Sequence, residues 1–131
     1  MTAPVIAALY GGLNALILIW LTAEVVRQRQ AGSIILGDGG DPAMTKLIRG
    51  HGNAAETIPL AIVLLTLAEL IGAPGFALHI VGVILTFGRV MHALHFTGRA
   101  PSLLYRTMGM AATLIALVLL SLGLVGHALI G

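Results

Sequence analysis

Apolar residues dominate four long stretches of this chain, and charged residues are rare in them. The stretches cover about residues 3–23, 54–71, 76–88 and 108–130. A helix that crosses a bilayer needs about 20 mostly apolar residues. The pattern therefore predicts an all-α membrane protein, a bundle of four transmembrane helices.

The second and third stretches reach that length only if the polar residues beside them are helical too. Asp41-Pro42 suits the start of a second helix that ends at Ile71, because Asp accepts hydrogen bonds from free N–H groups there and Pro fits the first helical position. The third helix then continues past Arg89 to Phe96. This extension makes polar side chains part of the bundle.

Short glycine-rich segments connect the predicted helices. A tight turn at 72–75 (GAPG) joins the second helix to the third, and a loop at 31–40, ending in GDGG, follows the first. Lys and Arg are missing before the first stretch but Arg27 and Arg29 follow it, so we interpret it as a retained helix and not as a signal peptide. We expect a single four-helix transmembrane domain over residues 1–131, without internal repeats.

The composition indicates that lipid surrounds most of the chain. Of its 131 residues, 58% are hydrophobic and 9% are charged, whereas roughly 25% are charged in ordinary soluble domains. The chain has no cysteine, hence no thiol nucleophile and no thiolate ligand, and we expect no metal site. Its seven basic residues are too few for the basic patches of a nucleic-acid-binding protein, so nucleic acid is not an expected partner.

The basic residues predict how the bundle crosses the membrane. With four spans, the loops after the first and third helices lie on one side, and both termini lie on the other. All seven basic residues are near those two loops: Arg27, Arg29, Lys46, Arg49, Arg89, Arg99 and Arg106. By the positive-inside rule, that side is cytoplasmic and both termini are on the non-cytoplasmic side.

Three polar residues form a stripe on the second helix. Arg49, Asn53 and Glu56 are four and three residues apart, which places them within about 40° of one another on one helix face. An ionisable group within a span is costly unless it is paired or hydrated. The stripe must therefore point away from lipid, and it is a candidate functional site.

A second stripe lies on the third helix at the same predicted end. Arg89, His92 and Phe96 are three and four residues apart, and Arg106 opens the fourth helix nearby. Together the stripes predict a basic pocket with an amide and one carboxylate. Such a pocket suits a small anion that also carries an amine, because arginines bind carboxylates and Glu56 binds ammonium.

Other interpretations of these polar residues stay open. Polar side chains hold membrane helices together, and Arg49 with Glu56 could form a structural ion pair. A non-catalytic bundle, whose polar stripe is structural or binds a small anion, is therefore the alternative function. A small multidrug transporter fits less well. Four-span transporters of that class need a carboxylate near the middle of the first helix, whereas Glu24 lies at the end of that helix. Near the opposite end, we expect Glu69 and His127 to be hydrated.

Several segments resemble one known family. The run 49–59 (RGHGNAAETIP) resembles the R-x-x-x-N-x-x-E signature in the second helix of the MAPEG family, membrane-associated proteins of eicosanoid and glutathione metabolism. Residues 89–92 (RVMH) and 99–101 (RAP) are similar to the third helix and following loop of its prostaglandin E synthase branch. With the GDGG loop, the likeness covers essentially the whole chain and is closest in style to short bacterial members.

The resemblance implies a homotrimer in the bacterial inner membrane, with glutathione as co-substrate between neighbouring subunits at the cytoplasmic side. Arg106 matches the family's catalytic arginine, which stabilises the glutathione thiolate, and Phe96 stands where family enzymes commonly have tyrosine. The glutathione-binding residues implied are Arg49, Asn53, Glu56, Arg89 and His92, together with Arg27 or Arg29 from the first helix, which would reach the carboxylates of glutathione.

The function so predicted is that of a glutathione-dependent transferase or peroxidase. The thiolate would attack a lipophilic electrophile or a hydroperoxide that enters from the bilayer. The chain needs no cysteine for this reaction, because the substrate brings the sulfur.

Overall fold

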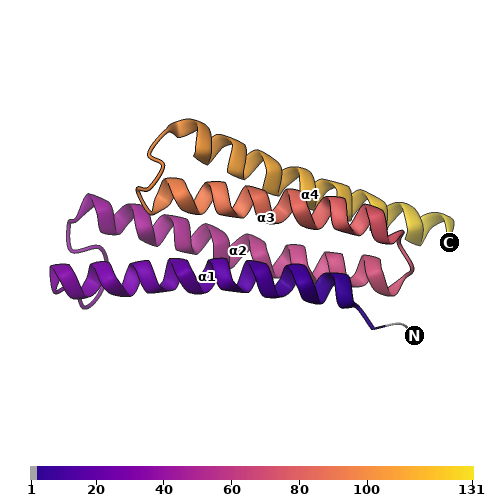
Figure 1. Cartoon of the computed structure of the whole chain (residues 1–131), viewed down its shortest axis with the longest axis horizontal. Coiled ribbons are helices and arrows are strands. Elements are labelled where there is room, and N and C mark those ends of the chain that lie inside the picture. The colour runs from indigo at the N-terminus through magenta and orange to yellow at the C-terminus, as the bar shows by residue number, and fades with distance from the viewer. Residues whose placement is uncertain (1–2) are drawn as a thin grey trace.

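The computed structural model of the protein describes residues 3–131, which form four helices (Figure 1). These are α1 (Val5–Gly32), α2 (Pro42–Leu70), α3 (Gly75–Phe96) and α4 (Leu103–Ile130). Each helix is long and apolar enough to cross a membrane. The predicted all-α fold with four spans is confirmed.

The helix ends follow local capping chemistry. The side chain of Asp41 accepts a hydrogen bond from the Ala43 N–H at 3.0 Å, and Pro42 occupies the first position of α2, as predicted. By contrast, α1 continues past the predicted Ala23 to Gly32, because the Glu, Arg and Gln residues that end the apolar stretch are good helix formers. α4 starts before the predicted Met108, since Ser102 caps its first turn.

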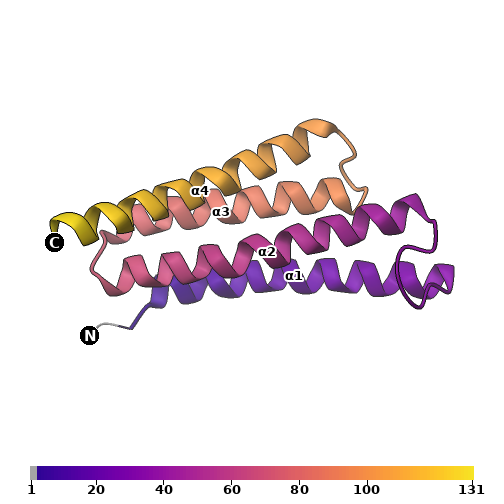
Figure 2. The same ribbon diagram turned by 180° about the vertical axis from the view of Figure 1, so that it is seen from behind.

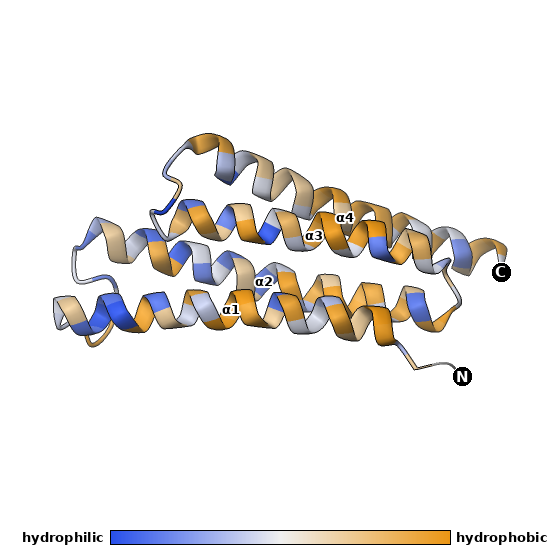
Figure 3. Cartoon of the chain, viewed as in Figure 1, coloured by the Kyte–Doolittle hydropathy of each residue, from blue (hydrophilic) through white to orange (hydrophobic). Residues whose placement is uncertain are grey.

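The helices run up and down in chain order, so the chain ends and the α2–α3 turn lie at one end of the bundle (Figures 1 and 2). The loops 33–41 and 97–102 lie at the other end, which is also where most hydrophilic positions are found (Figure 3). Within residues 3–131, α4 packs on α2 and α3 and makes no contact with α1. We call the end with the two loops the polar end.

The first two helices are longer than the hydrocarbon core of a bilayer is thick. α1 has 28 residues and α2 has 29, so each is about 42 Å long at about 1.5 Å per residue. The hydrocarbon core is only about 30 Å thick. One or two turns of each helix therefore extend into the headgroup region or water, where charged side chains are hydrated.

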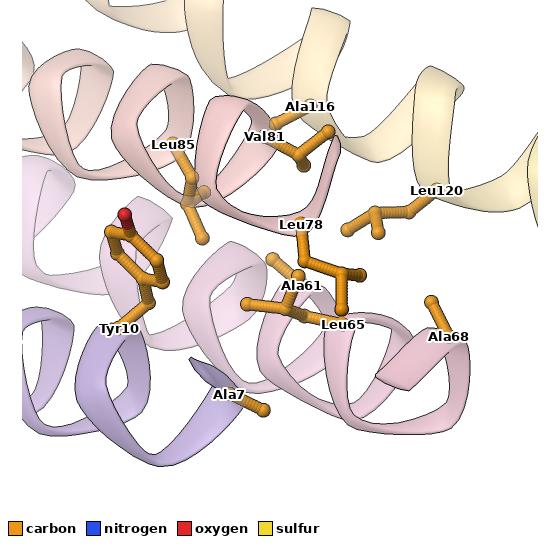
Figure 4. Packing of buried hydrophobic residues seen from close by; sticks show 10 residues of the cluster. All are labelled: Ala7, Tyr10, Ala61, Leu65, Ala68, Leu78, Val81, Leu85, Ala116 and Leu120. Carbon is orange, nitrogen blue, oxygen red and sulfur yellow. The ribbon is translucent and has the colours of Figure 1, made fainter. Parts of the chain in front are cut away.

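The main apolar core lies toward the chain ends and is contributed by all four helices (Figure 4). Tyr10 of α1 packs directly on Gly82 of α3, where a Cβ atom would overlap the tyrosine ring. Only glycine at this position allows the two helices to approach so closely. A smaller apolar cluster continues the core toward the polar end: Ile17, Leu21, Ala54, Ile58 and Ala93.

Glu69 has a structural partner that its sequence position did not indicate. Its two carboxylate oxygens accept hydrogen bonds from the backbone N–H groups of Ile6 and Ala7 at 2.9 and 2.7 Å. The sequence predicted hydration of Glu69 and gave no sign of these two backbone partners. The carboxylate caps the first turn of α1, where Pro4 offers no side-chain cap.

Candidate functional site

A cavity of about 390 Å³ lies between α2, α3 and α4 at the polar end. Its lining side chains are Lys46, Arg49 and Asn53 from α2, His92 and Phe96 from α3, and Arg106 and Met110 from α4. Three of them are cations and none is a carboxylate. Within residues 3–131, none of these three cations forms an ion pair. The cavity therefore has the electrostatics of an anion site.

The cavity brings together four of the predicted site residues, Arg49, Asn53, His92 and Arg106. Lys46 was not among the residues predicted for this site, although it lies three residues before Arg49 and extends the same stripe of α2. Met110 was also missed, because an apolar residue four positions after Arg106 carries no signal that distinguishes it from the rest of the span.

Arg89 lies behind the cavity wall and is fully buried. Its Nη1 atom donates to Asn53 Oδ1 at 2.9 Å and to Thr113 Oγ1 at 3.4 Å. Its Nη2 atom lies 3.2 Å from His92 Nδ1. Among the described residues, no carboxylate pairs with this guanidinium. Arg89 thus contacts two cavity residues without lining the cavity itself.

Glycines let α3 and α4 approach closely enough to form this cluster. A Cβ atom at Gly109 would lie 2.6 Å from the His92 backbone nitrogen, and one at Gly88 would lie 2.8 Å from the Gly109 carbonyl oxygen. One turn farther along α4, Thr113 consequently reaches Arg89. The close helix contact therefore positions the buried hydrogen-bond network.

Phe96 forms an aromatic wall of the cavity. Its ring stacks on His92 with the ring centroids 4.5 Å apart, and the Arg106 guanidinium carbon lies 5.7 Å from the Phe96 ring centroid. Gly50 of α2 makes room for Phe96, because a Cβ atom there would overlap its side chain. The Phe96 ring therefore lies at the edge of the cavity, between the His92 ring and the Arg106 guanidinium.

Three other predicted site residues lie outside the cavity. Arg27 pairs with Glu24 at 3.3 Å, and Arg29 Nη1 donates to the Gly37 carbonyl oxygen at 2.9 Å. Glu56 is exposed on α2, one turn deeper than Asn53, and has no ion pair or side-chain hydrogen bond among the described residues.

Glu24 connects α1 to the loop between α3 and α4. Its Oε1 atom accepts from Arg99 at 2.9 Å and from Trp20 Nε1 at 3.2 Å, and Arg99 also lies over the Trp20 ring. The carboxylate is thus engaged at the polar end. Glu24 therefore does not supply the free carboxylate near the middle of the first helix that a small multidrug transporter needs.

A second cavity, of about 370 Å³, lies near the chain ends between α2, α3 and α4. Its lining is apolar apart from His127, which is exposed. Among residues 3–131, no group of three or more metal-ligating side chains is arranged around a common point. Of the two cavities, the polar one is therefore the one whose lining carries charged side chains.

Comparison with known proteins identifies the family. Residues 7–126 match the sequence model of the MAPEG family. The chain belongs to the MAPEG family. It is also 43% identical, over 117 residues, to the inner membrane protein YecN of Escherichia coli (strain K12), an alignment that covers 89% of this chain and 88% of YecN. YecN of an O6:H1 strain matches equally well. The four spans and these relatives make this MAPEG protein a multi-pass inner membrane protein.

Proposed function

We propose that this MAPEG protein is a membrane glutathione-dependent transferase or peroxidase. The observation that carries the proposal is the cavity at the polar end, where Lys46, Arg49 and Arg106 converge without a carboxylate. Glutathione is a small anion with two carboxylates and a thiol that can ionise. Family membership favours the same ligand.

Arg106 is the residue proposed to activate the thiol. A free thiol has a pKa of about 8.5, so only a few per cent is thiolate at pH 7. Lowering this pKa by about two units takes about 2.7 kcal/mol of preferential thiolate stabilisation. One partly desolvated guanidinium can supply that amount. The thiolate then attacks a lipophilic electrophile that enters from the bilayer and displaces its leaving group. With a hydroperoxide, it cleaves the O–O bond, which releases an alcohol and leaves a sulfenic acid that a second glutathione converts to the disulfide and water.

We further propose that the cavity faces the cytoplasm and is completed by neighbouring subunits of a homotrimer. The distribution of Lys and Arg supports this orientation. The unpaired, exposed carboxylate of Glu56 supports a neighbouring subunit, because a lone carboxylate is costly on a lipid-facing surface. In such an assembly, Glu56, Arg27 and Arg29 would contribute to sites that one subunit leaves incomplete.

Ligand binding is tested by the melting temperature of the detergent-purified protein with and without millimolar glutathione. A ligand at 100 times its Kd stabilises the folded state by about 2.7 kcal/mol. We expect glutathione to raise the melting temperature of the native protein and to leave that of Arg49→Ala unchanged. Arg99→Ala is the matched control, because it removes an arginine of the same end that does not line the cavity. No rise in the native protein would contradict glutathione binding.

Catalysis is tested by glutathione-dependent turnover of a broad electrophile such as chlorodinitrobenzene. We expect Arg106→Ala to lower kcat/KM by at least tenfold, which corresponds to about 1.4 kcal/mol of lost transition-state stabilisation. The protein should still melt cooperatively, since Arg106 is exposed at the start of α4. Equal turnover in both proteins would contradict the catalytic role.

The buried contacts of Arg89 with Asn53 and Thr113 favour a second candidate, a non-catalytic bundle held together by its polar residues. In that case, Arg49→Ala or Glu56→Ala would destabilise the oligomer in detergent, and glutathione would protect neither variant. Protection of the native protein together with turnover distinguishes the enzyme from this alternative.

A further inference from the structure

The contact between Arg89 and His92 determines where His92 carries its proton. A guanidinium has five N–H donors and no acceptor. His92 Nδ1 lies 3.2 Å from Arg89 Nη2, so it must accept the hydrogen bond with its lone pair. The ring is then neutral and its proton is on Nε2.

The neighbouring His95 provides an internal contrast. Its Nδ1 atom lies 3.0 Å from the backbone carbonyl oxygen of Ser102. A carbonyl oxygen only accepts, so His95 Nδ1 must carry a proton. Two histidines that are one helical turn apart therefore differ in the state of Nδ1, and each state is set by a different partner.

Arg89 orients Asn53 in the same way. Its Nη1 atom donates to Asn53 Oδ1 at 2.9 Å, which fixes the carbonyl side of the amide toward the buried guanidinium. The amide nitrogen of Asn53 then lies on the other side, 3.7 Å from the sulfur of Met110, which lines the cavity. The acceptor atoms of Asn53 and His92 are thus both occupied by Arg89.

We propose that Arg89 is a positioning residue that makes the lining of the cavity a set of N–H donors. Asn53 Oδ1 and His92 Nδ1 both point toward Arg89. The polar groups that remain on the lining side chains are therefore the His92 Nε2–H, the Asn53 amide N–H and three cationic groups. The Met110 sulfur, a weak acceptor, already receives a hydrogen bond from Asn53. These side chains offer a thiol S–H no free oxygen or nitrogen acceptor, whereas they offer a thiolate or carboxylate several donors. The site consequently selects the ionised form of its ligand.

The donor assignment is tested without any ligand. The ¹⁵N resonances of histidine in the detergent-solubilised protein report which ring nitrogen is protonated, and His92→Gln identifies the His92 signals. We expect His92 to carry its proton on Nε2 and His95 to carry one on Nδ1. A proton on Nδ1 of His92 overturns the proposal, whether or not the protein binds glutathione.

The positioning role is tested with Arg89→Met, which removes all donors and leaves no buried carboxylate unpaired. In Arg89→Met, we expect the His92 Nδ1 resonance to move toward that of an imidazole nitrogen whose lone pair accepts no hydrogen bond. Thr113→Val, which removes another Arg89 contact, should leave the resonance in place. An unchanged Nδ1 resonance in Arg89→Met overturns the role. If Arg89→Met does not fold, Arg89→Leu replaces it, because leucine also offers no donor to His92 Nδ1. The same shift is expected and the same result overturns the role.

The consequence for the ligand rests on the proposed function and is tested with glutathione. We expect Arg89→Met to weaken binding about tenfold, on the scale of one hydrogen bond to a charged group. In a His92→Leu background, the same change should weaken binding less, because only the part that acts through Asn53 remains. Equal effects in the two backgrounds overturn the coupling. Absence of glutathione binding to the native protein contradicts the proposed function and leaves the histidine measurement to decide the role of Arg89.

Discussion

At the scale of single residues, two aspartates organise the loop 33–41. Hydrogen bonds from the Gly40 N–H and the Thr45 hydroxyl hold the pKa of Asp38 below its ordinary value of 3.8. The Gln28 amide does the same for the pKa of Asp41. Because these carboxyls bind protons more weakly in the folded state, they stabilise it above about pH 4, and this contribution is lost as the pH falls below that value. We expect Asp38→Asn to melt with a shallower pH dependence than the native protein between about pH 5 and pH 2.

Thr45→Val is the control for this prediction, because it removes one donor to Asp38 without changing the charge. It should flatten the dependence of melting temperature on pH in the same direction, but less. Parallel curves for the three proteins would show that Asp38 has the same pKa in the folded and unfolded states.

At the scale of elements, the site depends on the contact between α3 and α4. We expect Gly109→Ala to lower the melting temperature, because the added Cβ would meet the His92 backbone and the Gly88 carbonyl oxygen at 2.6–2.7 Å. Either backbone atom can move only if the helix that carries it moves as a whole. Overpacking of this kind typically lowers the free energy of unfolding by about 1–3 kcal/mol. Glutathione binding should weaken as well, since α4 carries Arg106 and Thr113. Detergent melting curves with and without glutathione measure both effects.

Gly126→Ala is the matched control on the same helix, because nothing lies within 4 Å of a Cβ atom at that position. It should melt at or above the temperature of the native protein, since alanine favours a helix more than glycine does. Equal losses in both variants would mean that glycine is needed in α4 for a reason other than this contact.

At the scale of the whole molecule, the testable property is the orientation of the bundle. The chain has no cysteine, so single cysteines can be introduced without background. Gln30 is exposed at the polar end and Gly131 ends the chain at the other. In intact cells, we expect a membrane-impermeant maleimide to label Gly131→Cys and not Gln30→Cys, because the basic end faces the cytoplasm.

A permeant maleimide should label both cysteine variants, which shows that each thiol is reactive. Labelling of Gln30→Cys from outside would reverse the proposed orientation. It would also place the cavity on the side opposite the cytoplasm.

Much of the architecture could be predicted from local sequence features. The four apolar stretches predicted the spans, and Asp41-Pro42 predicted the start of α2, because hydropathy and helix capping depend on neighbouring residues. The segments that resembled MAPEG predicted the family that the comparisons then identified. The spacing of Arg49 and Asn53 likewise predicted that they share a helix face, and both line the cavity.

The sequence by itself therefore determined that lipid surrounds most of the chain and that the chain has four spans. It also determined which end of the bundle is polar and to which family the chain belongs. Only the tertiary structure decided which polar residues meet. Arg89 is buried behind the cavity while Lys46 lines it, and Glu69 caps a helix that lies far from it in the chain. The physical reason is that helical spacing fixes the angles within one helix but not the rotation of one helix against another. Close contacts between helices, such as that of Gly109 with the His92 backbone, set that rotation.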